Sequence, residues 1–313
     1  MPRFYLQKFC DVDGLVWTYS DKNEPRADKP EATAVESNFY SPVRADGERF
    51  DEAEKLLGIF ESNAAPLWEC LCSGTVLTDE EREKVTLFLA AQYLRSPSSV
   101  RAGAEIMASF ASKAVDLITK DDEAYHQYLA DYEERTGNAT SPEMRAEARK
   151  LIGNPKNLSM SVLRAAGLPI LGGIPKLADI FLNMNWIVGR SRDQHLITSD
   201  CPVTRVSDPR THSRIYGDGA FANKTVRVTF PLTPTRIVEL TWKGNQREGV
   251  VEIPRKMAKE LNSIRAAQAE RFVYASKNDT GIVKLCKKWL EPEKRARIVM
   301  GRDTPAIDVK RKL

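Results

Sequence analysis

The chain has 313 residues, of which 42% are hydrophobic and 29% are charged, and its 47 basic and 43 acidic residues give a net charge of +4. Such a chain is long enough for one large globular domain or two closely packed ones, with a core that needs no disulfide or metal to hold it. No apolar run approaches the ~18 residues that a membrane-spanning helix requires, and the mild charge permits an acidic partner without demanding one.

The five cysteines are scattered along the chain, and their odd number and irregular spacing fit reduced thiols better than a disulfide framework. Cys70 and Cys72 form a C-x-C pair, which is not the C-x2-C spacing typical of zinc sites. The first nine residues, MPRFYLQKF, lack the long apolar stretch of a secretory signal. The sequence therefore predicts a cytoplasmic protein.

The N-terminal part of the sequence predicts one strand followed by helices. Residues 14–19 (GLVWTY) follow an Asp-Gly turn and are mostly apolar or aromatic, which is typical of a strand. Apolar residues recur at helical spacing over 50–64, which predicts an amphipathic helix. Thr78 and Glu81 form a capping box, and the helix that they open is apolar on nearly every side as far as Leu94, so we expect it to be central.

Ser96-Pro97 interrupts this central helix, because the residue before a proline is biased away from helical geometry. A further helix is predicted at 98–118, and helices with polar outer faces are predicted at 123–135 and 142–151. The stretch 167–175 (GLPILGGIP) is predicted to be a loop or a buried turn, since glycine and proline dominate it.

The apolar pattern changes in the C-terminal half. Residues 176–187 are apolar and fit either a helix or a strand. Beyond them the period approaches two, which predicts strands at 185–189, 195–198, 226–231 and 236–241. A long amphipathic helix is predicted at 253–273, and a last strand at 272–275.

A small N-terminal β element, a helical middle, a β-rich segment and a late helix predict an α+β fold. We expect a predominantly helical N-terminal and middle region, packed with a mostly antiparallel sheet that the C-terminal half forms. A single domain is predicted over 1–275, with its helical part at about 50–183 and its β-rich part at about 185–275. A basic C-terminal extension follows over 276–313.

Three polar side chains fall on helix faces that should be buried. Gln92 follows Phe88 by four residues in the most apolar helix, and Arg95 lies on the same face three residues later. Glu61 lies at the edge of the apolar stripe of the 50–64 helix. A buried arginine needs an acidic partner, because an unpaired buried charge is costly. Glu61 and Asp200 are the natural candidates.

This cluster has two interpretations. The structural one is an internal ion pair that fixes helix packing. The functional one is a pocket in which Arg95 holds an anion such as phosphate and Gln92 orients it. In that pocket the carboxylates of Glu61 and Asp200 would act as a base or as Mg²⁺ ligands.

Asp200 lies in the stretch Ser199-Asp200-Cys201-Pro202, directly after a predicted strand. A carboxylate at this position can accept backbone N–H groups two residues on, while Pro202 fixes φ, and both are features of a turn. Turns at strand ends are also where sites are often placed. A turn role and a site role for Asp200 are therefore compatible.

The sequence contains none of the common catalytic or cofactor motifs. Its three histidines form no H-x-H or H-E-x-x-H pattern and no Cys/His cluster exists, which argues against zinc. It also has neither a phosphate-binding glycine loop nor a G-x-S-x-G elbow. Mg²⁺ is the metal that a carboxylate cluster would favour, and the residues do not otherwise define a metal site.

From Lys284 to Leu313 the basic residues outnumber the acidic ones, and they are densest in KKWLEPEKRARIV and VKRKL. Such a tail is typically a solvated helix or a frayed end. The alternative is a sequence-independent contact between this basic C-terminus and nucleic acid phosphates.

Several short motifs follow one another along the chain: PRFYLQKF at the start, GLVW at 14–17, NFY at 38–40, SDCP at 199–202 and FPLTP at 230–234. Over residues 2–275 this series resembles DUF4238, a bacterial family of unknown function. The family's Ser-Asp-x-Pro motif matches Ser199 to Pro202, and a polar position of its late helix matches Asn262. The resemblance thus brings Ser199 and Asn262 into the candidate site. The His-Tyr-Val that precedes the proline in the family is absent before Pro2.

Two functions from different classes follow from these observations. The first is a nuclease-like hydrolase of a phosphodiester or related anionic substrate, with Asp200 and Glu61 as catalytic carboxylates. Its substrate-binding residues would be Arg95, Gln92, Ser199 and Asn262. The second is a non-catalytic binding or interaction module in which the same cluster is a buried structural ion pair.

Overall fold

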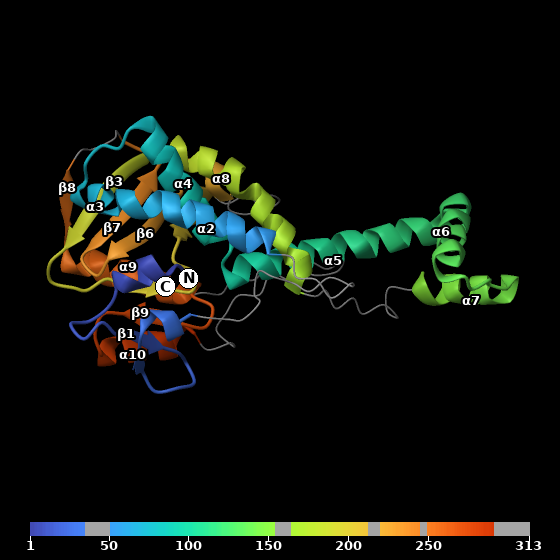
Figure 1. Ribbon diagram of the computed structural model, residues 1–313, viewed down its shortest axis with the longest axis horizontal. Coiled ribbons are helices and arrows are strands. Elements are labelled where there is room, and N and C mark those ends of the chain that lie inside the picture. The colour runs from blue at the N-terminus through green and yellow to red at the C-terminus, as the bar shows by residue number, and fades with distance from the viewer. Residues whose placement is uncertain (35–50, 154–163, 212–219, 245–248, 291–313) are drawn as a thin grey trace. The chain divides into compact units, whose positions relative to one another are not determined.

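The computed structural model describes residues 1–34, 51–153, 164–211, 220–244 and 249–290 (Figure 1). The chain divides into two compact units, the first made of Met1–Ser98 with Leu171–Leu313, and the second of Ser99–Ile170. The described residues contain many helices and two mostly antiparallel sheets. The predicted α+β class is therefore confirmed.

The larger sheet of the first unit has five strands in the order β5-β6-β7-β3-β8. β3 and β8 run parallel, and all other neighbours are antiparallel. Three of these strands confirm the predictions at 185–189, 226–231 and 236–241. The strand bounds are β3 Asn185–Ser191, β5 Thr204–Val206, β6 Arg227–Thr233, β7 Arg236–Thr241 and β8 Val250–Ile253.

The smaller sheet has the order β2-β1-β9-β4 and pairs N-terminal strands with C-terminal ones. The sheets are therefore not built from the C-terminal half alone. The strand predicted at 195–198 is mostly wrong, because only its last residue belongs to β4, and Asn262 instead bonds the backbone of His195 and Ile197. The strand bounds are β1 Val16–Tyr19, β2 Arg26–Asp28, β4 Thr198–Ser199 and β9 Val273–Ala275.

Helix α4 (Asp79–Leu94) is central to the first unit, as its sequence predicts, and packs between α2 (Glu52–Ala64) and α8 (Ile174–Leu182) (Figure 1). Its capping box is present: the Thr78 hydroxyl accepts from the Glu81 N–H at 3.3 Å, and the Glu81 carboxylate accepts from the Thr78 N–H at 2.9 Å. The other helices of this unit are α1 Arg3–Gln7, α3 Trp68–Ser73, α9 Arg255–Gln268 and α10 Thr280–Trp289.

An aromatic cluster joins these helices to the larger sheet. The ring of Trp68 lies 5.3–6.0 Å from the rings of Phe4, Tyr5, Phe88 and Phe230, mostly edge to face. Its indole N–H donates to the Leu232 carbonyl at 3.2 Å. Large aromatic side chains bury much apolar area, and a satisfied indole adds no penalty, so this cluster anchors α1, α3 and α4 on β6.

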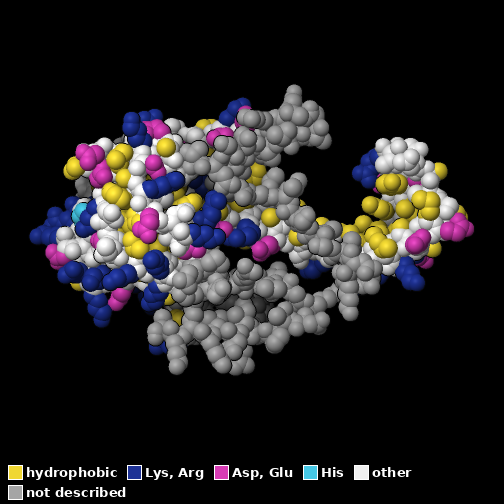
Figure 2. Space-filling model, turned by 90° about the horizontal axis from the view of Figure 1, so that it is seen from below, with side chains coloured by type: hydrophobic (Ala, Val, Ile, Leu, Met, Phe, Trp, Pro, Cys, Tyr) yellow, Lys and Arg dark blue, Asp and Glu magenta, His cyan; other side chains and the backbone are white. Residues whose placement is uncertain are grey.

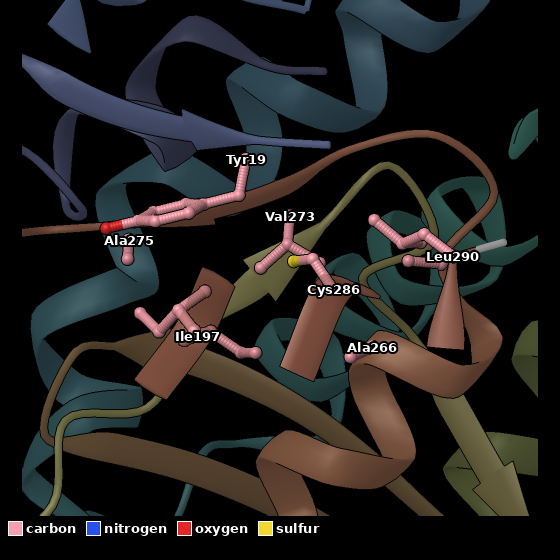
Figure 3. Close-up of a cluster of buried hydrophobic side chains, with 9 residues drawn as sticks. Tyr19, Ile197, Ala266, Val273, Ala275, Cys286 and Leu290 are labelled. Atoms are coloured by element: carbon pink, nitrogen blue, oxygen red, sulfur yellow. The ribbon is translucent and has the colours of Figure 1, made fainter. Parts of the chain in front are cut away.

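A second buried cluster lies under the smaller sheet (Figure 3). Tyr19 of β1 and Val273 of β9 meet Cys286 of α10 there, and Leu290 closes its end. The core of the first unit therefore continues past residue 275, into a helix that lies in the predicted basic extension.

Two segments differ from their predictions. The helix predicted at 253–273 ends at Gln268, because Asp200 binds the backbone N–H groups of residues 270–272 in an extended connection to β9. The stretch 167–175, predicted to be a loop or a buried turn, lies mostly in a 3₁₀ helix, Arg164–Gly173, that contains the buried Leu168 and Leu171 and leads into α8. The NFY motif at 38–40 lies outside the described residues.

The second unit is helical, with bounds close to those predicted. Its helices are α5 Pro97–Lys120, which begins in the first unit, α6 Asp122–Thr136 and α7 Pro142–Ile152. Asp121 and Ser141 cap α6 and α7 by accepting N–H groups at 2.8 and 3.2 Å. Arg149 of α7 donates to the Thr119 carbonyl at 2.7 Å, which ties α7 to the end of α5.

Gly74 offers a test of the packing between α3 and β8. A Cβ at Gly74 would meet the Gly249 carbonyl oxygen at 2.3 Å, whereas a Cβ at Gly14 would meet nothing within 4 Å, and both residues have φ +74°. We expect Gly14→Ala to lower the free energy of unfolding by about 1 kcal/mol, from backbone strain alone. Gly74→Ala should lower it by about 3–4 kcal/mol. Equal urea midpoints for the two variants would contradict this contact.

Candidate functional site

Helices α2 and α4 bring Glu61 and Arg95 together. Arg95 Nη1 lies 2.5 Å from Glu61 Oε1, and the two side chains are 7% and 28% exposed. The predicted burial of Arg95 and its pairing with Glu61 are confirmed. The pair joins the C-terminal end of the central helix to its neighbour, so its geometry suits an ion pair that fixes helix packing.

Gln92 lies one turn before Arg95 on α4 and is 1% exposed, so its predicted burial is also confirmed. Neither its amide nitrogen nor its amide oxygen has a hydrogen-bond partner among the described residues. A buried amide without partners is costly and requires an explanation, such as a bound water or a ligand.

Asp200 follows β4 directly and is buried, with three backbone donors on its carboxylate. Oδ1 accepts from the Glu270 N–H at 2.8 Å, and Oδ2 accepts from the N–H groups of Arg271 at 2.7 Å and Phe272 at 3.2 Å. Burial raises the pKa of Asp200, and the three N–H donors act in the opposite direction. In the described part of the chain this carboxylate bonds backbone alone and does not contact Arg95.

Ser199 and Asn262 also bond the backbone. The Ser199 hydroxyl donates to the Cys201 carbonyl at 3.0 Å and accepts from the Cys201 N–H at 3.2 Å, which is a local turn. The Asn262 amide donates to the His195 carbonyl at 2.8 Å and accepts from the Ile197 N–H at 3.1 Å. Both side chains thus shape the segment around β4.

These contacts belong to a polar seam, which we define as Asp200 with three residues of α9: Asn262, Arg265 and Gln268. Arg265 donates to the Pro202 carbonyl, and Gln268 bonds both backbone groups of Arg205, at 3.1 and 2.7 Å. The α9 residues are spaced three apart, so they follow one face of the helix. The polar seam binds the backbone of residues 195–205 to α9 and to the chain that leaves it.

Arg265 is the member of the seam that sequence reasoning missed. It is 1% exposed and has no acidic partner among the described residues, while its second Nη donates to the Thr229 hydroxyl at 3.1 Å. Burial lowers the pKa of Arg265 to about 10, and Tyr5 and Cys201 act in the opposite direction. A signal was available, because Arg265 follows Leu261 by four residues on the apolar face of α9.

The α-amino group of Met1 connects the two groups of predicted residues. Burial, with a smaller contribution from the charge of Arg95, lowers its pKa to about 5, while Glu61 and Asp200 act in the opposite direction. The charges of Glu61, Arg95 and Asp200 thus all act on the α-amino group, which itself donates to the Ala34 carbonyl at 3.4 Å. Among the described residues, Glu61 and Arg95 contact each other directly, while Ser199 and Asn262 bond the backbone of residues 195–201.

Other features that could mark a site are few in the described ranges. Among those residues, no group of three or more His, Cys, Asp or Glu side chains could hold a metal ion. A cavity of about 20 Å³ beside Arg82 and Trp186 has room for about one water, and none of the predicted site residues lines it. No described helix is both long enough and apolar enough to cross a membrane.

The Glu61–Arg95 pair can be tested by a double-mutant cycle with Glu61→Gln and Arg95→Met. We expect a coupling energy of about 1–2 kcal/mol, because Arg95 is buried and Glu61 mostly so. The exposed Glu80–Lys84 pair on the same helix is the matched control and should show no resolvable coupling. Unfolding in urea measures both cycles, and equal coupling would contradict a structural role for the buried pair.

Comparison with known protein families gives a match over most of the chain. The model of the family described as "Protein of unknown function (DUF4238)" covers residues 1–279. No curated protein and no solved structure matches the chain. The match covers most of the chain, including the segments that hold Glu61, Gln92, Arg95 and the polar seam. The chain therefore belongs to the DUF4238 family, whose function is unknown.

Proposed function

We propose that this protein is a non-catalytic binding or interaction module in which the carboxylate–arginine cluster holds the fold together. The observation that carries the proposal is the capture of the Asp200 carboxylate by three backbone N–H groups. A general base or metal ligand must offer a lone pair to its substrate or ion. Three of the roughly four lone pairs of the Asp200 carboxylate are engaged by these N–H groups, and the residue is only 9% exposed, so little of the carboxylate is left to meet a substrate or ion.

The Glu61–Arg95 pair supports the same proposal. An arginine that clamps a phosphate presents both edges of its planar group to the ligand. Arg95 instead directs one nitrogen at Glu61 and keeps only 7% of its side chain exposed. The pair is better placed to join α2 to α4 than to bind an anion from solvent.

The second candidate is the nuclease-like hydrolase, and one observation favours it. The unpartnered amide of Gln92 lies one turn from Arg95, and the Glu61 side chain with which Arg95 pairs is 28% exposed. Buried polar groups without partners occur at functional sites as well as at bound waters. In this proposal Glu61 is the catalytic carboxylate and Gln92 orients the substrate.

A cleavage assay separates the two candidates. The pure protein is incubated with RNA and with DNA, in Mg²⁺, in Mn²⁺ and in EDTA. A non-catalytic interaction module should not cleave either substrate, so we expect no cleavage above the level of the blank. Cleavage that Glu61→Gln abolishes, and that Glu105→Gln on an exposed helix face leaves intact, would overturn the module and establish the hydrolase.

We propose separately that the basic C-terminal region contacts nucleic acid. Its described part is α10, where Lys284, Lys287 and Lys288 are exposed. Replacing all three with glutamine should reduce the slope of log affinity against log salt by about 2–3. The matched control is the triple change of Arg255, Lys256 and Lys259 on α9, which should leave that slope unchanged. A salt response that is flat in the parent protein would contradict phosphate contacts.

We also propose that the protein is located in the cytoplasm. All five cysteines are free thiols in the structure, and three of them are buried. Reduced thiols fit a reducing compartment.

A further inference from the structure

The second unit carries an unusual share of the exposed apolar surface. Eight of the fourteen large hydrophobic side chains that are exposed in the described residues lie within Ser99–Ile170, less than a quarter of the chain. Figure 2 shows hydrophobic side chains gathered on the helices of this unit. A contiguous exposed apolar surface of this kind typically marks an interaction site.

On α5 these side chains form a single stripe, which we call the α5 stripe. Its large members are 42–69% exposed, Ala114 is exposed, and Ile118 is half-buried. At about 100° per residue, all members lie within about 120° of one another around the helix, and Ser112 lies on the opposite face. The stripe consists of Ile106, Met107, Phe110, Ala114, Leu117 and Ile118.

Between residues 106 and 118 the α5 stripe faces away from the contact that α5 makes with α7, and it continues the side of α5 on which Gly103 packs. Thr119 of α5 is buried, and its carbonyl accepts from Arg149 of α7, on the side of the helix opposite the centre of the stripe. Near the N-terminal end of α5, Gly103 lies against Gly167. The stripe from residue 106 to residue 118 is thus left without a described partner over about 18 Å.

The stripe is symmetric along the helix about residue 112. Its members lie two, five and six residues on either side of that position. If a second α5 packs antiparallel across the stripe, Ile106 meets Leu117 on one flank, Met107 meets Ile118 on the other, and Phe110 meets Ala114 at the centre. Every apolar side chain then meets an apolar one, and the largest member meets the smallest, which lets two helices interdigitate.

Charge also favours a second copy over other partners. The stripe contains no charged residue, and only Lys113 lies at its flank. A nucleic acid or an anionic membrane would call for several basic side chains around the apolar face. An uncharged, self-complementary stripe suits an isologous contact, in which the same surface serves both subunits.

We propose that the α5 stripe is a self-association surface through which two copies of this chain pair antiparallel about Ser112. The proposal deepens the interaction module by naming its partner, and it rests on that proposed function. The apolar surface that four large side chains leave exposed is on the order of 400 Å² per copy, which is below the ~800 Å² of a standard interface. We therefore expect a reversible dimer with a dissociation constant of about 1–100 µM.

Sedimentation velocity at about 1–200 µM of the full chain tests the pairing. The parent protein should change from monomer to dimer over this range. Ala114→Glu should remain a monomer, because it places a carboxylate against Phe110 of the second copy. Ser112→Glu is the matched control on the opposite face and should dimerise as the parent does. Circular dichroism and melting temperature confirm that both variants are folded.

The charge of Lys113 provides a second test, because its effect on dimerisation depends on this particular pairing of the two helices. The two-fold axis places Lys113 of both copies on the same side of the pair, about 3 Å apart along the helix axis. Salt should therefore strengthen the dimer, whereas it weakens contacts with nucleic acid phosphates. An equimolar mixture of Lys113→Glu with the parent should associate more tightly than either protein alone.

Cysteine cross-linking tests the direction. In a Cys70→Ser background, a mixture of Ile106→Cys and Leu117→Cys should form a disulfide-linked dimer, and Ile106→Cys alone should not. A parent that stays monomeric at about 200 µM, or an Ala114→Glu variant that dimerises normally, would overturn the proposal. A monomer that binds lipid vesicles through the stripe would assign this surface to a membrane instead. The cleavage assay is independent, so an active nuclease that dimerises would overturn only the non-catalytic function.

Discussion

Replacing Asp200 with alanine is expected to lower the free energy of unfolding by about 3–5 kcal/mol. The carboxylate accepts from the N–H groups of Glu270, Arg271 and Phe272, and it is buried. Removing it leaves three partly buried donors without this acceptor, and a fully buried donor so stranded costs about 1–3 kcal/mol. The cost is large because the side chain holds the exit of α9 and the entry of β9 at once.

Asp200→Asn should lower the free energy of unfolding by less than Asp200→Ala does. The amide oxygen of asparagine can still accept from some of the N–H groups, whereas its NH₂ group faces the others, donor against donor. Asp193→Ala is the matched control, because Asp193 is exposed and close in sequence. Its urea midpoint should equal that of the parent. An Asp200→Ala protein with unchanged stability would remove the main support for a structural carboxylate.

Replacing Arg265 with methionine is expected to cost about 2–4 kcal/mol. The substitution keeps apolar volume but leaves the carbonyl of Pro202 and the hydroxyl of Thr229 without their donor. Burying an arginine without an acidic partner is itself expensive, as its lowered pKa of about 10 reflects. We expect the lost hydrogen bonds to outweigh the relief of that penalty.

The control for Arg265 is Arg255→Met, at an exposed position on the same helix. It removes the same charge and should leave the urea midpoint unchanged. If Arg265→Met were as stable as the parent or more so, the desolvation of the buried cation would exceed the value of its hydrogen bonds, as happens in some buried ion pairs. The polar seam would then serve to specify one arrangement of α9 rather than to stabilise it.

Together these residues give the Ser-Asp-x-Pro segment a physical role. The backbone around β4 carries few strand partners, because β4 itself spans only Thr198–Ser199. The polar seam satisfies the remaining backbone groups from α9 and positions Pro202 under Arg265. Buried backbone groups must be paired, so a short strand at the edge of a sheet needs such side chains.

Local signals in the sequence were sufficient for much of the fold. The capping box of Thr78 and Glu81 marks the start of α4 because its hydrogen bonds join residues three apart. The apolar and β-branched run at 236–241, which follows the turn residues 232–235, gives the bounds of β7, since such runs after a turn are typical of strands. Within the candidate site, the burial of Gln92 and Arg95 followed from their place on an apolar helix face.

Only the tertiary structure decided which distant segments meet. The apolar period predicts one helix over residues 253–273, yet α9 ends at Gln268. It ends there because the carboxylate of Asp200, some 70 residues earlier in the chain, accepts the backbone N–H groups that follow the helix. The pairing of β1 with β9 joins chain ends that no local pattern relates. Sequence patterns report the faces of single elements, whereas the partner of Asp200 is a backbone that becomes available only when two distant elements pack together.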